Sequence, residues 1–179
     1  MSPDNIQIML CVVGMPGCGK SIFLDAAEEF DYPIVSMGNA VRAETKKRGL
    51  PPECHGEVAE QLREERGLAA VAHLIIDKVT LTCIIDGVRG LEEVDLFNEH
   101  YSTEIVAIHA SPKTRFCRLK KRHRPGDPVT WREFTERDMR ELTFGIGDVI
   151  ALADYVLVNE STKHQFEARC RAFLKKWRI

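Results

Sequence analysis

The sequence predicts an α/β fold in which a five-stranded parallel sheet is flanked by helices. Short apolar runs alternate along the chain with segments of helical periodicity, the pattern of a parallel sheet wrapped by helices. The first apolar run, residues 6–13, is almost continuous, which is typical of a strand covered on both faces. The chain has 179 residues, enough for one compact domain with its own core.

The elements follow from local patterns, taken in chain order. Short apolar runs predict strands over 6–13, 34–36, 82–85, 104–109 and 155–158. Apolar residues at helical spacing predict helices over 20–30, 40–47, 57–78 (one or two helices), 91–98, 112–122, 131–142, 148–153 and 162–176.

Turn-forming residues set the ends of several helices. Asn39 is predicted to cap the helix 40–47, and Gly49 with the prolines after it ends that helix. Gly67 interrupts the segment 57–78. The polar segment 123–130 contains two prolines and a glycine, and it predicts a loop.

Composition disfavours several classes of protein. The formal net charge of −2 argues against a dedicated nucleic-acid binder, which usually carries a strongly basic face. No apolar run approaches the roughly 18 residues of a membrane span, and residues 6–13 read as a strand rather than a signal peptide. The six cysteines include no CxxC pair, and Cys54-His55 alone is a poor zinc site. We therefore expect a cytoplasmic protein with reduced cysteines.

A glycine-rich segment directly after the first predicted strand matches the pattern GxxxxGK[ST]. It consists of Gly14, Met15, Pro16, Gly17, Cys18, Gly19, Lys20 and Ser21. Its glycines let backbone N–H groups turn inward around a phosphate, and the following helix directs its positive end there. Lys20 is expected to bridge the β- and γ-phosphates, and Ser21 to offer its hydroxyl to Mg²⁺. The segment predicts a P-loop NTPase fold that binds ATP with Mg²⁺.

The residues after the later strands indicate the type of reaction. The strand ending at Asp86 is followed by Gly87, so no glutamate stands beside the Mg²⁺-ordering aspartate to activate water. The last strand runs into Asn159-Glu160-Ser161 and lacks the Asn-Lys-x-Asp element of guanine-specific switches. This pattern favours phosphoryl transfer to a bound acceptor over hydrolysis.

Arginines are expected to supply the remaining positive charge. Arg42 and Arg89 follow strands and should lie at the carboxyl edge of the sheet, where open α/β sheets bind ligands; each could equally be a solvated surface residue. A basic cluster at 118–124 and a second at 137–140 flank the predicted loop, as in a lid that closes over a transferring phosphate. A solvated basic helix and a single-strand nucleic-acid patch are the alternatives, and the second is disfavoured because no aromatics are interleaved.

Four segments resemble known kinases. The segment Met37-Gly38-Asn39-Ala40-Val41-Arg42-Ala43-Glu44 resembles the adenylate kinase string Thr-Gly-Asp-Met-Leu-Arg-Ala-Glu, whose arginine holds the acceptor phosphate. Residues 86–89 resemble that family's Asp-Gly-Phe-Pro-Arg, shortened by one residue, and residues 118–122 resemble its Arg-Leu-x-x-Arg lid stem. Residues 153–159 are similar to the start of the last strand in dephospho-CoA kinase. The whole chain resembles an archaeal family of adenylate-kinase-related, dephospho-CoA-kinase-like proteins.

The resemblance implies a nucleoside monophosphate kinase-like fold in a single domain, residues 1–179. An acceptor subdomain would lie near 37–78 and a lid near 118–140. The predicted catalytic residues are Lys20, Arg122 and Arg140, which would neutralise the transferring group. The P-loop, with Arg118 and Asn159, would bind ATP; Ser21 and Asp86 would hold Mg²⁺; and the acceptor would contact Gly38, Arg42, Asp86 and Arg89.

The leading hypothesis is thus ATP- and Mg²⁺-dependent phosphotransfer to a small nucleotide-type acceptor. One alternative is dephospho-CoA kinase, whose hydroxyl acceptor needs a carboxylate base; Asp25, Glu44 and Asp86 are the candidates. Another is a non-catalytic ATP-gated module that binds a protein or RNA. The expected partners are small nucleotides, with neither nucleic acid nor membrane, and the sequence leaves monomer and dimer open.

Overall fold

The structure is a computed structural model that describes residues 8–79, 82–124 and 126–177. Its strands form one parallel sheet in the order β2-β3-β1-β4-β5. The strands are β1 (Ile8–Val13), β2 (Ile34–Ser36), β3 (Cys83–Asp86), β4 (Ser102–His109) and β5 (Tyr155–Val158). The predicted α/β fold with a five-stranded parallel sheet is confirmed, and β1 occupies its centre.

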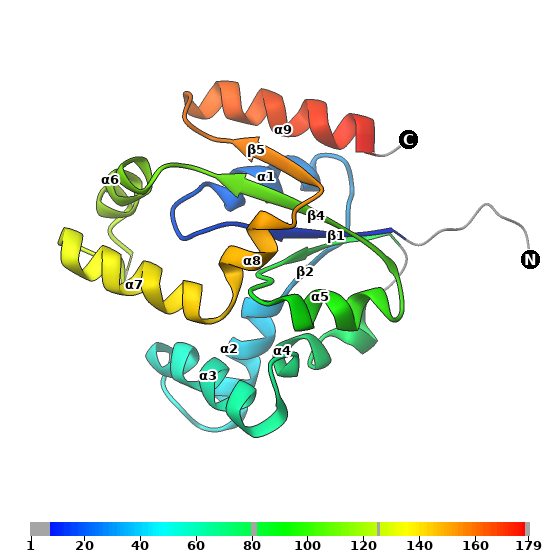
Figure 1. The fold of residues 1–179 in the computed structure, drawn as a ribbon, viewed down its shortest axis with the longest axis vertical. Coiled ribbons are helices and arrows are strands. Elements are labelled where there is room, and N and C mark those ends of the chain that lie inside the picture. Colours follow the sequence, from blue (N-terminus) through cyan, green and yellow to red (C-terminus); the bar gives the residue numbers. More distant parts are fainter. Residues whose placement is uncertain (1–7, 80–81, 125, 178–179) are drawn as a thin grey trace, which may run out of the picture.

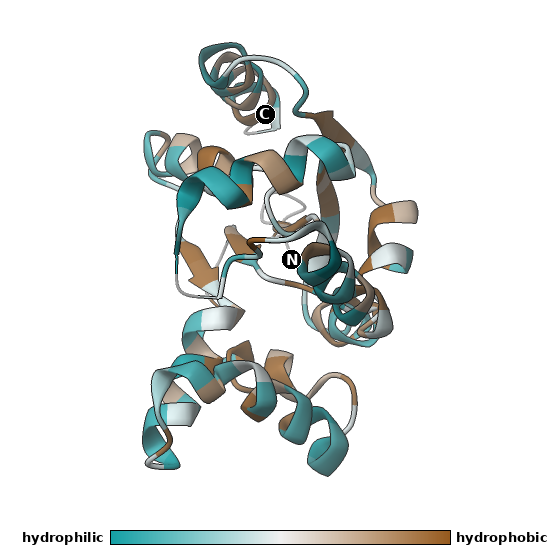
Figure 2. Cartoon of the chain, turned by 90° about the vertical axis from the view of Figure 1, so that its left-hand side faces the viewer, coloured by the Kyte–Doolittle hydropathy of each residue, from teal (hydrophilic) through white to brown (hydrophobic). Residues whose placement is uncertain are grey.

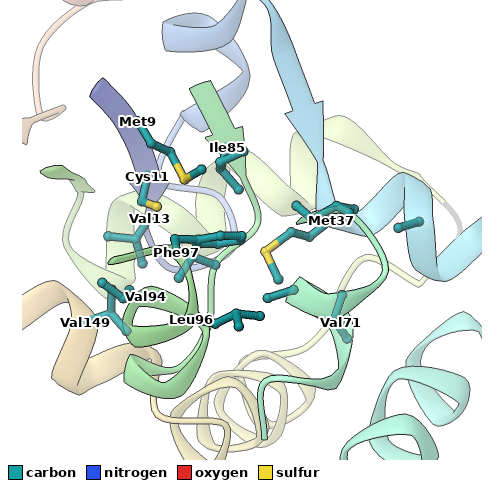
Figure 3. Packing of buried hydrophobic residues seen from close by; sticks show 14 of the residues in the cluster. Met9, Cys11, Val13, Met37, Val71, Ile85, Val94, Leu96, Phe97 and Val149 are labelled. Carbon is teal, nitrogen blue, oxygen red and sulfur yellow. The ribbon is translucent and has the colours of Figure 1, made fainter. Parts of the chain in front are cut away.

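Helices cover both faces of the sheet, and the side chains of β1 alternate between two cores. On one face, α1 (Lys20–Glu28) and α9 (Lys163–Trp177) pack against Leu10 and Val12 (Figure 1). On the other, α5 (Leu91–Asn98) and α8 (Ile146–Ala151) meet Met9, Cys11 and Val13 in the cluster drawn in Figure 3. Each fully buried side chain of this size contributes about 1.5–3 kcal/mol to folding. Two filled faces therefore fix the position of β1.

The remaining helices form two groups. α2 (Met37–Lys47), α3 (His55–Arg66) and α4 (Ala70–His73) pack together at the bottom of Figure 1, where α4 contacts α5, with short 3₁₀ turns at Pro52–Cys54 and Ile76–Lys78. α6 (Pro112–Arg122) and α7 (Trp131–Thr143) project from the edge where the strands end, on the left of Figure 1. Figure 2 views this edge, with hydrophilic outer helical faces and hydrophobic strands between them. Within the described ranges, no helix is both long and apolar enough to span a bilayer.

Two helix boundaries refine the sequence analysis. The segment predicted as one or two helices forms both α3 and α4, and α3 ends at Gly67, whose φ of 88° is left-handed. The prediction that Asn39 caps the next helix is wrong, because α2 already begins at Met37. Ser36 is its N-cap, and its hydroxyl accepts the backbone N–H of Asn39 at 3.3 Å. The chain thus enters the helix directly from β2.

Candidate nucleotide-binding site

The P-loop connects the central strand β1 to the first turn of α1. Gly17 and Gly19 have φ angles of 82° and 103°, a left-handed conformation that glycine adopts without strain. Cys18 N–H donates to the Met15 carbonyl at 3.1 Å, and Lys20 Nζ donates to the Gly14 carbonyl at 2.7 Å. The Lys20 side chain therefore folds back over the P-loop, where its ammonium contacts the first residue of the motif.

Arg118 and Asn159 support the loop from outside, although they lie far from it in sequence. Asn159 is 1% exposed, and its Nδ2 donates to the Cys18 carbonyl at 2.8 Å. Arg118 donates to the same carbonyl at 3.4 Å and to both oxygens of Asn159 at 3.0 and 3.1 Å. The structure brings both predicted ATP-binding residues against the P-loop.

Asp86 stands beside the P-loop because of the strand register. It pairs with Val12 of β1 on one side and with Ser36 of β2 on the other. Its Oδ1 is buried and has no hydrogen-bond partner in the part of the chain that the structure describes. A buried carboxylate oxygen without a partner costs free energy. A bound cation, or a water molecule of its hydration shell, would satisfy this atom.

Mg²⁺ fits the oxygens available at this position. Ser21 is exposed on the first turn of α1, directly after the glycines of the P-loop. Mg²⁺ is usually held by one or two protein oxygens together with phosphates and waters, rather than by a protein cage. Ser21 and Asp86 would hold the ion beside the phosphates.

The loops after β2 and β3 lie close together, and they carry the residues that the sequence predicts to bind an acceptor. A Cβ added to Gly87 would lie 3.7 Å from the backbone nitrogen of Gly38, and one added to Gly38 would lie 3.4 Å from Arg42 Nη1. The Arg42 guanidinium also donates to Asn39 Oδ1. Gly38, Arg42 and Asp86 are thus gathered at one place.

Arg89 is connected to helix α7. Its Nε pairs with Glu141 Oε2 at 2.9 Å, and its side chain is 36% exposed. Its backbone N–H donates to Glu93 Oε2 at 2.7 Å. The other oxygen of Glu93 accepts from Arg63 Nη2 of α3 at 2.9 Å. The loop after β3 is therefore connected to α3 through Glu93 and Arg63, and to α7 through Glu141.

The Arg63–Glu93 ion pair is almost completely buried, with side-chain exposures of 7% and 1%. Burial raises the pKa of Glu93, while Arg63 and the Arg89 N–H act in the opposite direction. Because removing one member would leave the other as an uncompensated buried charge, both are needed for the loop to keep its place. Sequence patterns had not singled out either residue.

The lid arginines have different surroundings. Arg122 Nε donates to Asp127 Oδ2 at 2.8 Å, and Arg137 Nη1 lies 3.3 Å from Asp127 Oδ1. Thr130 and Glu133 form a capping box at the start of α7. Arg140 is exposed, and no ion pair of its side chain occurs among the described residues. In this conformation Arg122 is held by Asp127, whereas Arg140 faces solvent.

The ion pairs of Asp127 with Arg122 and Arg137 predict that stability depends on pH. Hydrogen bonds from Arg122 lower the pKa of Asp127 from 3.8 to about 2. A lowered folded-state pKa means that the stabilisation is complete above pH 4 and is lost as the pH falls through 2. Asp127→Asn should therefore unfold more easily at pH 7, by up to about 2 kcal/mol, and the difference from the parent should shrink by about half at pH 3.

Urea unfolding of the parent and Asp127→Asn at several pH values measures this difference. Glu136→Gln is a matched control, since Glu136 pairs on the surface of α7 with Arg132, whose side chain is 88% exposed. Exposed pairs contribute only about 0–1 kcal/mol. A pH-independent difference for Asp127→Asn would contradict the assignment.

Comparisons with known proteins identify the family and the fold. A family model described as "AAA domain" matches residues 13–134. A "UPF0200 protein" of Hyperthermus butylicus is 46% identical over 176 residues, which cover 95% of each chain. The crystal structure of shikimate kinase from Bacteroides thetaiotaomicron has a TM-score of 0.64 at 15% identity, covering 96% of this chain and 99% of the other. A gluconokinase from Sinorhizobium meliloti has a TM-score of 0.59 at 16% identity, covering 97% and 94%.

Proposed function

Because this chain belongs to the AAA domain family and to the archaeal UPF0200 proteins, we propose that it is an ATP- and Mg²⁺-dependent phosphotransferase. Its fold is that of P-loop kinases. The acceptor that we propose is a small nucleotide-type molecule, such as a nucleoside monophosphate.

One observation supports the proposal most directly: the donor and acceptor elements converge on Asp86. The aspartate is paired in register with β1, which leads into the P-loop, and with β2, which leads into Gly38 and Arg42. Its buried Oδ1 has no hydrogen-bond partner among the described residues. This arrangement suits transfer between two bound molecules, because catalysis of phosphoryl transfer consists mostly of positioning and charge neutralisation.

Each proposed role follows from position. Lys20 and the loop N–H groups would bind the β- and γ-phosphates, and Ser21 and Asp86 would hold Mg²⁺, which neutralises charge on the phosphate oxygens. Arg42 of α2 would bind the acceptor together with Arg89, which lies in the loop after β3. Arg140, and Arg122 after release from Asp127, would come to the transferring group. Arg118 and Asn159 would complete the ATP site.

Dephospho-CoA kinase is the second candidate. A hydroxyl acceptor needs a carboxylate near it, and the three candidates differ in their surroundings. Glu44 is bound to Arg48 Nε at 3.1 Å, and Asp25 is exposed on α1. Asp86 alone combines burial with a carboxylate oxygen lacking a partner among the described residues. A non-catalytic ATP-gated module would have no need of Arg42 at the acceptor side.

The products of the reaction test the proposal. Protein would be mixed with Mg²⁺–ATP and, separately, with nucleoside monophosphates, dephospho-CoA or no acceptor. We expect ADP and phosphorylated acceptor in equal amounts with one class of acceptor, and loss of both products when EDTA removes Mg²⁺. Release of free phosphate without an acceptor would indicate hydrolysis, and the absence of any turnover would favour the regulatory module.

A further inference from the structure

Arg115 of α6 lies behind the P-loop and contacts four groups. Its side chain is 5% exposed. Nη1 donates to the Pro16 carbonyl of the P-loop at 3.2 Å, and Nε donates to the Ala110 carbonyl after β4 at 3.1 Å. Both terminal nitrogens bind Asp138 of α7, at 2.8 and 2.6 Å. The guanidinium carbon also lies 4.9 Å from the centre of the Phe134 ring.

The contact with Pro16 sets the direction of a neighbouring N–H group. In a trans peptide the C=O and the following N–H point in opposite directions, and the structure contains no cis peptide bond within its described residues. Since the Pro16 carbonyl is directed at Arg115, the Gly17 N–H is directed away from that guanidinium. The Cys18 carbonyl, held by Asn159, orients the Gly19 N–H in the same way.

Helix α6 packs closely against this part of the P-loop. A Cβ at Gly17 would lie 2.9 Å from the Arg115 carbonyl and 2.9 Å from Leu119 Cγ. The loop therefore rests directly on the helix that carries Arg115. Moving the guanidinium would remove the partner of Pro16 without any other described side chain taking its place.

Asp138 determines where that guanidinium stays. Its own side chain is 13% exposed, so the ion pair is largely removed from water. A buried arginine that loses its carboxylate is an uncompensated charge and turns toward solvent where it can. Here that movement would release the Pro16 carbonyl and with it the orientation of the Gly17 N–H.

We propose that Arg115 is a positioning residue for the phosphate-binding loop, and that Asp138 couples the loop to helix α7. The inference rests on the proposed function only in that the P-loop binds nucleotide phosphate. Coupling of this kind is reciprocal: if a docked α7 favours phosphate binding, phosphate binding favours a docked α7. Helix α7 also carries Arg137 and Arg140, so the coupling would bring the lid arginines into place when the donor site is filled.

The test compares Asp138→Asn with Glu136→Gln, a control that removes a carboxylate from the exposed side of the same helix. Mg²⁺–ADP is titrated into each protein by calorimetry. We expect Asp138→Asn to bind Mg²⁺–ADP about tenfold more weakly than the parent, because a misoriented Gly17 N–H would lose about one hydrogen bond to the phosphate. Glu136→Gln should bind like the parent. Hydrogen exchange then follows residues 131–143. Mg²⁺–ADP should protect them in the parent and the control but not in Asp138→Asn.

A second variant separates positioning from stability. Replacing the ion pair by apolar residues, as in Arg115→Met with Asp138→Leu, should restore thermal stability toward that of the parent because neither buried charge remains. Its affinity for Mg²⁺–ADP should stay about tenfold weak, because Pro16 still lacks its donor. Recovery of affinity together with stability would refute the positioning role, as would an Asp138→Asn protein that binds like the control.

Failure of this inference is distinguishable from failure of the proposed function. Binding of Mg²⁺–ADP requires no acceptor. If the variants show the expected affinities for Mg²⁺–ADP but the parent transfers no phosphate, the kinase proposal alone is refuted. A parent that transfers phosphate, with Asp138→Asn unchanged in affinity, would refute the inference alone. A parent that binds no Mg²⁺–ADP would overturn both.

Discussion

Lys20→Ala should lower phosphotransfer by about a thousandfold or more while the protein remains folded. The ammonium is placed where negative charge develops on the transferring phosphate, and removal of one such preorganised group costs about 10²–10³ in rate, more when it carries a full charge. Within the described residues the side chain donates one hydrogen bond, to the Gly14 carbonyl, and it belongs to neither core cluster. Its loss should therefore leave stability almost unchanged.

Turnover with Mg²⁺–ATP and the best acceptor, together with thermal unfolding, measures both parts of this prediction. Lys163→Ala is the control, because Lys163 is 74% exposed on α9 and its ion pair among the described residues is with Glu167. Transfer within tenfold of the parent would show that the P-loop is not the active site.

Arg42→Ala should weaken acceptor binding by ten- to a hundredfold and leave ATP affinity nearly unchanged. The loss corresponds to about 1.5–3 kcal/mol for one charge-assisted, bidentate contact with an acceptor phosphate. Arg42 is exposed, and its side chain donates to Asn39 on its own helix, so we expect the fold not to depend on it. Arg42→Lys should recover only part of the affinity, since lysine keeps the charge but lacks the planar fork.

Calorimetric titration of each nucleotide separates the two sites. Arg132→Ala provides a control for removing an exposed arginine, because Arg132 is bound to Glu136 on the outer face of α7. If Arg42→Ala lost ATP and acceptor binding alike, Arg42 would be structural, and the two-site assignment would lose its main acceptor contact.

The sequence predicted those features that local patterns determine. The five strands and the P-loop depend on short apolar runs and on glycines within a few residues of one another, and the structure places them as expected. The start of α2 was misplaced because two capping residues, Ser36 and Asn39, stand three positions apart and propensity does not choose between them. The structure selects Ser36 because β2 ends at this residue and the helix follows directly.

Long-range ion pairs could not be read from the sequence. Arg63 and Glu93 are separated by 30 residues, and Arg115 and Asp138 by 23, with no periodicity that links them. Each of these arginines lies on a helix rich in charge, where a solvated role is the ordinary expectation. Burial distinguishes them, and burial depends on how the helices pack. Likewise, Arg122 was predicted to reach phosphate from its place in a motif, whereas its pairing with Asp127 depends on the turn of the loop.

The central position of β1 also governs the order in which the molecule can assemble. Its partners arrive late in the chain: Val12 pairs with Asp86 on one side and with Val106 on the other. Contacts between residues so far apart require large loops to close first, which slows folding. The last support of the P-loop, Asn159, comes later still. During synthesis, Cys18 of the phosphate-binding loop therefore leaves the ribosome 141 residues before Asn159, and the loop cannot take its final form until Asn159 has followed.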